Sequence, residues 1–93
     1  MVSERYRWDD RSYDKVTGAG LRWPQVIEAL RNRPRVRLHL GAMLRIAARD
    51  DQGAWVLVTL IEEDDDEYLI VSARTLTEQE AAAAAVMTEG GPR

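Results

Sequence analysis

The 93-residue sequence predicts a single α+β domain: a mainly antiparallel sheet of four to five strands, with two helices before it and one after it. Four runs rich in aliphatic and β-branched residues lie between Val36 and Ala73, and a turn signal bounds each run. The breaks are Gly41-Ala42, Asp50–Gly53 and the acidic run from Glu62 to Glu67. Alternation along these strands gives one apolar face and one mixed face, so we expect helices on the apolar face only.

Short elements are expected before the sheet. Residues 5–8 alternate in polarity and predict a short first strand, after which Asp9 or Asp10 caps a short helix. Pro24 stands at the first position of a second helix, where its missing N–H costs nothing. Pro34 ends that helix, because the residue before a proline avoids the helical region.

The last element is an alanine-rich helix. Thr77 and Glu80 have the spacing of a capping box, which predicts a helix over residues 78–88. The helix has few large apolar side chains, so we expect weak docking. The ordered core is predicted to span residues 5–88, followed by a flexible tail at 89–93.

The turn lengths predict the register of the sheet. A three-residue loop after Asp50 pairs Arg49 with Trp55, and a six-residue loop over the acidic run pairs Trp55 with Arg74. An odd-length turn at Gly41 is expected to place Val36, Leu38 and Leu40 on the core face. The predicted core face then consists of Val36, Leu38, Leu40, Leu44, Ile46, Ala48, Val56, Val58, Leu60, Leu69, Val71 and Ala73. The predicted mixed face consists of Arg35, Arg37, His39, Arg45, Arg49, Trp55, Leu57, Thr59, Ile61, Tyr68, Ile70, Ser72 and Arg74.

The composition excludes several classes of site. The chain has no cysteine and one histidine, so we expect neither a disulfide framework nor a thiolate or histidine metal site, and no cofactor motif is present. No apolar run is long enough to span a membrane, and the N-terminus lacks a secretory signal, which predicts a cytoplasmic protein. The sequence leaves the oligomeric state open.

The net charge of −3 conceals a basic remainder. Residues 62–67 are all acidic, and without them 13 basic residues stand against 10 acidic ones. Twelve of the 13 are arginines, the side chain suited to bidentate contact with phosphate or carboxylate. The acidic run itself admits three interpretations: a solvated hairpin loop, a docking site for a basic partner, or a metal site.

The predicted mixed face holds the candidate functional residues. Arg49, Trp55 and Arg74 form one row, with Arg45 and Ser72 nearby on the same face. This row is either ordinary surface packing or a site where an aromatic ring stacks a base while arginines hold phosphates. His39 alternates with Arg35 and Arg37 and is either a general acid or base or a surface residue.

Several segments of the chain together resemble the BrnT family. The matching segments are Arg7-Trp8-Asp9, Gly20-Leu21, Trp23 through Val26 with Glu28-Ala29, the strands on either side of Gly53, Val71-Ser72-Ala73-Arg74, and Glu78 or Glu80. BrnT proteins are ribonuclease toxins of type II toxin–antitoxin systems and have a RelE-like fold. Three features differ from the family pattern: Gly18-Ala19-Gly20 replaces a Lys-His-Gly step, Thr75 replaces a basic residue, and a long polar loop is shortened to Gly41-Ala42-Met43.

The resemblance implies a metal-independent endoribonuclease in which the RNA 2′-hydroxyl attacks the adjacent phosphate. Of the family's candidate functional positions, Arg74 carries over directly and Arg45 less directly. Together with His39 from the predicted mixed face, the catalytic candidates are Arg74, Arg45 and His39. The nucleic-acid-binding candidates also come from the predicted mixed face: Arg35, Arg37, Arg49, Trp55, Tyr68 and Ser72. The implied partners are RNA and a small antitoxin-like protein. The missing Lys-His pair keeps a second hypothesis open, a non-catalytic module of the same fold that binds nucleic acid or protein.

Overall fold

A computed structural model describes residues 5–89. Residues 1–4 and residues 90–93 of the predicted tail lie outside this range, whereas Glu89, also predicted to belong to the tail, is the last residue of a helix. The described residues form three helices and one five-stranded mixed sheet. The strands are β1 (Arg5–Arg7), β2 (Arg35–Leu40), β3 (Met43–Arg49), β4 (Trp55–Asp64) and β5 (Glu67–Thr75). The helices are α1 (Asp10–Gly18), α2 (Trp23–Arg31) and α3 (Glu78–Glu89). The chain therefore has the predicted α+β class, with two helices before the long strands and one after them.

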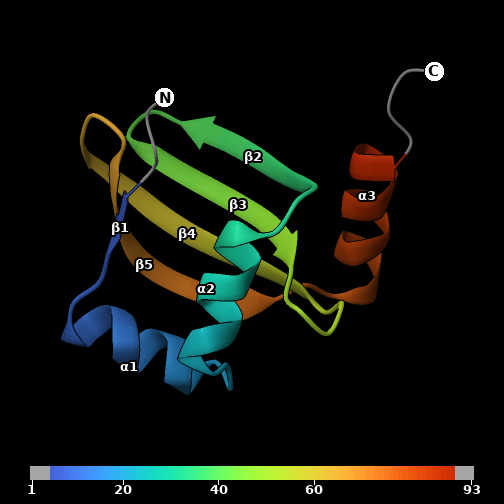
Figure 1. The fold of residues 1–93 in the computed structure, drawn as a ribbon, viewed down its shortest axis with the longest axis horizontal. Helices are drawn as coiled ribbons and strands as arrows, with labels where there is room; N and C mark the ends of the chain where they lie inside the picture. Colours follow the sequence, from blue (N-terminus) through green and yellow to red (C-terminus); the bar gives the residue numbers. More distant parts are fainter. Residues whose placement is uncertain (1–4, 90–93) are drawn as a thin grey trace.

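The sheet has the strand order β1-β5-β4-β3-β2 (Figure 1). Strands β2 to β5 form an antiparallel meander, because each is joined to the next by a short hairpin. The short strand β1 lies parallel to β5 at the other end of the sheet. Parallel neighbours need a long connection, and here the whole chain from α1 through β4 supplies it.

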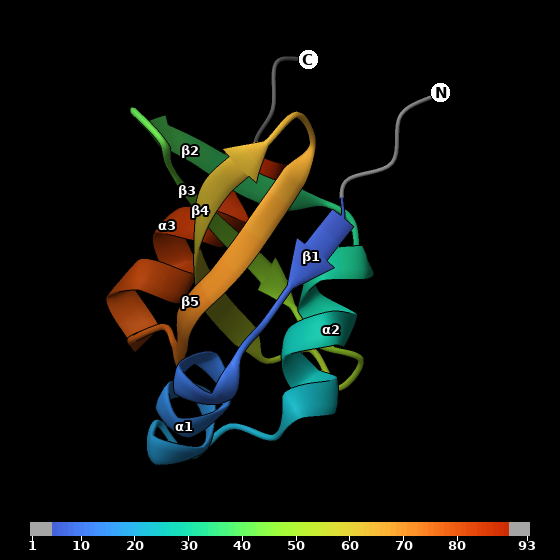
Figure 2. The same cartoon turned by 90° about the vertical axis from the view of Figure 1, so that its left-hand side faces the viewer.

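Helices cover both faces of the sheet. Figure 2 shows α1 and α2 on one side and α3 on the other. The prediction that helices occupy one face only is therefore wrong. It failed because the sequence of α3 has no strongly apolar stripe, so nothing in it indicated which face the helix would contact. We call the two surfaces the α1/α2 face and the α3 face.

The hairpin between β3 and β4 has the predicted register. Arg49 lies opposite Trp55, and Ile46 lies opposite Val58. Asp50 fixes the loop: its buried carboxylate accepts hydrogen bonds from the backbone N–H groups of Gln52 and Ala54, both at 2.9 Å. Burial alone would raise the pKa of Asp50, but these hydrogen bonds and one from Gln25 lower it, so the carboxylate stays charged.

The hairpin between β4 and β5 differs from the prediction. The acidic run is not a six-residue loop, because both strands continue through it to a tight turn and Asp64 pairs with Glu67. Farther along, Leu60 pairs with Ile70 but Thr59 pairs with Ser72, so one extra residue of β5, Val71, forms a bulge.

The bulge reverses the parity of β5. Tyr68 and Ile70 turn into the core on the α1/α2 face, whereas the prediction had placed Leu69 and Val71 there. Beyond the bulge, Ser72 remains on the α3 face as predicted. The shift also moves Arg74 opposite Leu57 and away from Trp55, which corrects the predicted row.

Helix α1 packs against the bulge. Asp9 caps the helix, as predicted, through a reciprocal capping box with Ser12 at 2.9 and 3.1 Å. The buried hydroxyl of Ser12 also donates a hydrogen bond to the carbonyl oxygen of Ile70. A bulge disrupts the ladder of a sheet, and Ser12 supplies a partner at this point.

Strand β2 is inverted relative to the prediction. The turn at Gly41-Ala42 contains two residues, not an odd number, and Gly41 adopts a positive φ of 63°, which a two-residue hairpin favours. The side chains of Val36, Leu38 and Leu40 therefore lie on the α3 face. The side chains of Arg35, Arg37 and His39 lie on the α1/α2 face.

The core lies between the sheet and the first two helices. It consists of Val16, Leu21, Val26, Ala29, Leu30, Leu44, Ile46, Ala48, Val56, Val58, Leu60, Tyr68, Ile70 and Ala73. Pro24 lies in the first turn of α2, as predicted. The one-sided core leaves the α3 face only partly covered, and polar side chains occupy its open part.

Adjacent residues of β5 test the bulge. Ile70→Asp should lower the free energy of unfolding by about 4 kcal/mol or more, because it buries a charge in a fully buried site. Leu69→Asp should lower it by only about 1 kcal/mol, because that side chain lies half-exposed on the other face. Urea unfolding followed by circular dichroism measures both changes. A larger loss of unfolding free energy for Leu69→Asp than for Ile70→Asp would support a register without the bulge.

Candidate functional site

The α3 face is organised as four cross-strand rows. The rows are Leu40–Met43–Ile61–Leu69, Leu38–Arg45–Thr59–Ser72, Val36–Ala47–Leu57–Arg74 and Arg49–Trp55. Successive rows are two residues apart along a strand, which is about 7 Å. The β2 side of this grid is apolar, whereas the polar side chains Arg45, Thr59, Ser72 and Arg74 lie on β3 to β5 beside Leu57, Ile61 and Leu69.

The polar part of the α3 face forms a shallow cavity of about 280 Å³. Arg45 from β3, Thr59 from β4, and Ser72 and Arg74 from β5 line it together with Leu57. Each of these side chains has its place because the strand pairing is fixed and the bulge returns Ser72 and Arg74 to this face. Two guanidinium groups and two hydroxyl groups therefore surround one small space, which we call the arginine pocket.

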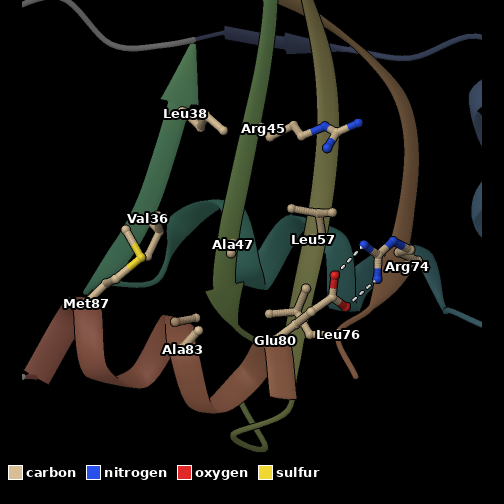
Figure 3. A pocket seen from close by; sticks show the side chains of 11 residues that line it. Val36, Leu38, Arg45, Ala47, Leu57, Arg74, Leu76, Glu80, Ala83 and Met87 are labelled. Carbon is tan, nitrogen blue, oxygen red and sulfur yellow. Dashed lines mark hydrogen bonds and ion pairs between the residues drawn. The ribbon is translucent and has the colours of Figure 1, made fainter. Parts of the chain in front are cut away.

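Arg74 is held by helix α3. Its Nη1 and Nη2 atoms donate hydrogen bonds to Oε1 and Oε2 of Glu80, both at 2.8 Å (Figure 3). The predicted capping box is confirmed and adds two more hydrogen bonds, from Thr77 N–H to Glu80 at 2.9 Å and from Glu80 N–H to the Thr77 hydroxyl at 3.2 Å. Glu80 thus joins the first turn of α3 to the last residues of β5.

The ion pair lowers the pKa of Glu80 and raises the pKa of Arg74. Hydrogen bonds from Arg74 and from the Thr77 backbone lower the pKa of Glu80 from 4.5 to about 2. The hydrogen bonds to Glu80 raise the pKa of Arg74, against a smaller opposing effect of burial. Both groups are charged at neutral pH, and Glu80 is too weak a base to accept a proton in catalysis.

Arg45 differs from Arg74. Its side chain is exposed, and within residues 5–89 it has no hydrogen-bonding or ionic partner. Figure 3 shows it over the centre of the sheet, on the same side as Arg74. An exposed guanidinium with two hydroxyls nearby is a ready donor set for a phosphate or carboxylate.

Of the predicted row Arg49–Trp55–Arg74, the contact between Arg49 and Trp55 is present. The guanidinium carbon of Arg49 lies 4.8 Å from the centre of the Trp55 ring, a cation–π distance. Trp55 is half-buried at the end of the α3 face. Arg74 does not flank this indole, because the bulge moves it one row away.

An apolar groove continues from the arginine pocket toward β2. A second cavity of about 280 Å³ lies between the sheet and α3. Its floor includes Val36, Leu38 and Leu57, and α3 contributes Ala83 and Met87 (Figure 3). The alanines of α3 leave this space open because they have no side chains long enough to fill it.

Four predicted site residues lie elsewhere. Tyr68 is buried in the core with its ring centre 6.4 Å from that of Tyr6, so it cannot stack on a ligand. Arg35, Arg37 and His39 lie on the opposite face of the sheet. The arginine pocket therefore has no histidine, and the predicted proton-transfer role of His39 does not fit this geometry.

Two residues with a place in the site were missed as site residues. Thr59 was assigned to the mixed face but given no role, although it lies directly between Arg45 and Ser72. Glu80 was identified as a capping residue and as a position of the BrnT resemblance, but it was given no role in the site. Its capping box begins three residues after Arg74, and this short distance was the available indication that the two side chains could pair.

The acidic hairpin is partly neutralised. Arg7 donates two hydrogen bonds of 2.9 Å to Glu63, and Arg5 lies 3.6 Å from Glu67. Among the described residues, no group of acidic or histidine side chains is arranged to hold a metal ion. The contacts from β1 are consistent with a hairpin that is solvated and pinned by its neighbouring strand.

Comparison with known protein families finds no family model that matches the chain, and comparison with curated proteins finds no significant match. In the described part of the chain, no helix is both long enough and apolar enough to cross a membrane.

The Arg74–Glu80 pair predicts an acid-sensitive helix α3. The pKa of Glu80 is lower in the folded state, so its stabilising contribution is complete above pH 4.5 and is lost as the pH falls toward about 2. We expect the ¹³Cα shifts of Ala81–Ala85 to move toward random-coil values over this range. Glu80→Gln should reduce their helical shifts already at pH 6.

Glu78→Gln is the matched control, because it changes an acidic residue of the same turn that does not contact Arg74. It should leave the alanine shifts at pH 6 unchanged. Equal helicity in Glu80→Gln and the wild type at pH 6 would show that the ion pair does not hold α3.

Proposed function

We propose that this chain is a BrnT/RelE-like protein that binds single-stranded RNA on its α3 face, with the arginine pocket holding a phosphate. The observation that carries the proposal is the convergence of Arg45, Arg74, Thr59 and Ser72 on one cavity. The α+β class and the five-stranded, mainly antiparallel sheet are coarsely compatible with the fold that the resemblance implies.

The spacing of the rows supports an extended polyanion. Arg45, Arg74 and Arg49 lie in three successive rows, so their side chains are offset by about 7 Å steps along the strands. A nucleic acid strand offers phosphates at regular intervals, and its bases offer flat faces. Trp55, backed by Arg49 at 4.8 Å, supplies an aromatic surface at the end of this series.

The geometry favours binding over catalysis. RNA cleavage by 2′-hydroxyl attack gains from a group that moves a proton as well as from charge stabilisation. His39 lies on the other face of the sheet, and Glu80 is held ionised by Arg74. The pocket thus keeps the groups that hold a phosphate and lacks a matched acid or base among its lining residues.

Salt dependence tests the RNA-binding proposal. Log affinity for a single-stranded RNA should fall linearly with log salt, and Arg45→Ala should reduce the slope by about 0.7 because one phosphate contact is lost. Trp55→Ala should weaken binding by about 1–3 kcal/mol with little change of slope, because stacking releases no counterions. Fluorescence anisotropy of a labelled oligonucleotide measures both effects.

Arg11→Ala provides the control, since Arg11 is an exposed arginine of α1 on the other side of the sheet. The Arg11→Ala variant should match the wild type in its affinity for the RNA and in the slope of log affinity against log salt. Equal losses for Arg11→Ala and Arg45→Ala would mean that binding depends on net charge alone, which would contradict a defined site.

A ribonuclease toxin is the second candidate function, and the presence of Arg45 in the same cavity as the Ser72–Arg74 segment favours it. The segment from Ile70 to Arg74 carries the most specific part of the BrnT resemblance, and Arg45 lies across from it in the same pocket. Here the RNA 2′-oxygen would attack the adjacent phosphorus and the P–O5′ bond would break, leaving a 2′,3′-cyclic phosphate and a 5′-hydroxyl. Water would take the 2′-hydroxyl proton and protonate the leaving 5′-oxygen, and two guanidiniums would stabilise the phosphorane charge. Such catalysis requires contact between Arg74 and the phosphate. Arg74 would make this contact either beside its ion pair with Glu80 or in place of it.

Induced expression in a bacterium separates the two candidates. A toxin should arrest growth and degrade RNA, and Arg45→Ala should abolish both effects at equal protein level. Harmless expression with intact RNA, combined with salt-dependent binding in vitro, would leave the binding module as the function.

A further inference from the structure

The outer edge of β2 is open. The sheet ends at this strand, and within residues 5–89 no other strand pairs with its outer side. The strand has six residues, whereas β1 at the opposite end has three. Unpaired N–H and C=O groups along an edge can accept a further strand, and natural proteins usually block long edges. Neither a proline nor a bulge interrupts β2.

An apolar strip follows this edge on the α3 face. Leu38 and Leu40 are 52% and 53% exposed, although they lie in a regular strand. Val86 and Met87 in the last turns of α3 are 68% and 65% exposed. Figure 3 shows Met87 beside Val36 at the beginning of β2, so the helix and the strand contribute to one surface. The strip needs an apolar cover that the described residues do not provide.

The other face of the same edge is basic. Arg35, Arg37 and His39 alternate with the apolar residues, and residues 31–40 contain four arginines and no acidic residue. Arg35 is anchored, because its Nη1 donates hydrogen bonds to Tyr6 Oη at 3.3 Å and to the Leu30 carbonyl at 3.1 Å. The edge therefore has an apolar side and a cationic side in strict alternation.

We propose that the β2 edge binds an extended segment of a partner protein in which apolar and acidic residues alternate. Strand addition would satisfy the open backbone groups. Its apolar side chains would cover Val36, Leu38 and Leu40 beside Met87. Its acidic side chains would lie next to Arg35 and Arg37, where cross-strand opposite charges are favourable. This surface adjoins the arginine pocket through the groove that Val36 and Leu38 line, but Arg35, Arg37 and the open backbone groups of β2 lie outside that pocket. The proposal therefore does not depend on RNA binding.

Charge argues against a second copy as the occupant. A symmetric antiparallel pair of β2 strands keeps equivalent faces on the same side of the joined sheet. Every such register therefore places basic residues opposite basic residues, either Arg37 opposite Arg37 or Arg37 opposite Arg35 or His39. Like charges directly opposite each other destabilise strand pairing. An acidic partner removes this repulsion.

A designed peptide tests the proposal on the full chain. The probe is a nine-residue, end-capped and fluorescein-labelled peptide that alternates valine and glutamate, followed by anisotropy. We expect saturable binding that is at least tenfold weaker for a valine–lysine peptide. Binding of the valine–glutamate peptide should also be at least tenfold weaker when its alternate backbone nitrogens are methylated. Methylation blocks strand addition and leaves the charge of the peptide unchanged.

Two substitutions locate the binding surface. Leu40→Glu should weaken binding of the valine–glutamate peptide at least tenfold. Ile61→Glu is the matched control, because Ile61 is an exposed residue of the same cross-strand row on the interior strand β4, and it should change binding less than twofold. Arg37→Glu should reverse the preference in favour of the valine–lysine peptide. Circular dichroism verifies that each variant is folded.

Four results would contradict the proposal. No saturable binding, or equal binding of the methylated peptide, excludes strand addition. Equal binding of the lysine peptide excludes the acidic partner. Self-association that Leu40→Glu abolishes, measured by sedimentation without peptide, assigns the edge to a second copy. If Leu40→Glu fails to fold, the methylated peptide decides the question with the wild-type chain.

Discussion

One extra residue in β5 determines where the functional side chains lie. Tyr68, Ile70, Ser72 and Arg74 would all share a face in an uninterrupted strand, because they are two residues apart. The bulge at Val71 divides them, so the first two fill the core and the last two lie on the α3 face. A strand without the bulge would have to expose the first pair or bury the second. The fold and the arginine pocket thus depend on the same irregularity.

The surrounding structure supports this irregularity from both sides. On the α1/α2 face, the buried hydroxyl of Ser12 donates to the carbonyl of Ile70 next to the bulge. On the α3 face, Arg74 is fixed by its bidentate pair with Glu80. The first support belongs to the core, whereas the second is an exposed ion pair at the end of an alanine-rich helix. The Arg74–Glu80 pair is consequently the support that a change of pH or of bound ligand would disturb most easily.

The meander also divides the arginines between the two faces of the sheet. Arg45, Arg49 and Arg74 lie on the α3 face, where an aromatic ring and two hydroxyls accompany them. The arginines of β2 lie on the opposite face and next to an open edge. A cluster that looks continuous in the sequence is therefore two surfaces, and each has its own neighbours and its own proposed ligand.

Sequence reasoning succeeded where the chain carries local rules. The β3–β4 register followed from a three-residue loop and alternation, and the caps of α1 and α3 followed from residues within one turn. It failed where the decision was not local. The bulge at Val71 has no marker in the residue pattern, and the parity of β2 depended on whether its turn contained two residues or three. The side covered by α3 was missed as well, although Arg74 and Glu80, which join the helix to that face, are only six residues apart.

The side-chain NMR signals of the arginines give the most direct test of the central claim, that the α3 face binds RNA. A titration of the ¹⁵N-labelled protein with single-stranded RNA should shift the Nε–Hε resonances of Arg45, Arg49 and Arg74 in a saturable manner. The resonances of Arg35 and Arg37 should stay in place, because they lie on the other face of the sheet. Shifts confined to Arg35 and Arg37 would contradict the account, as would uniform shifts of all five.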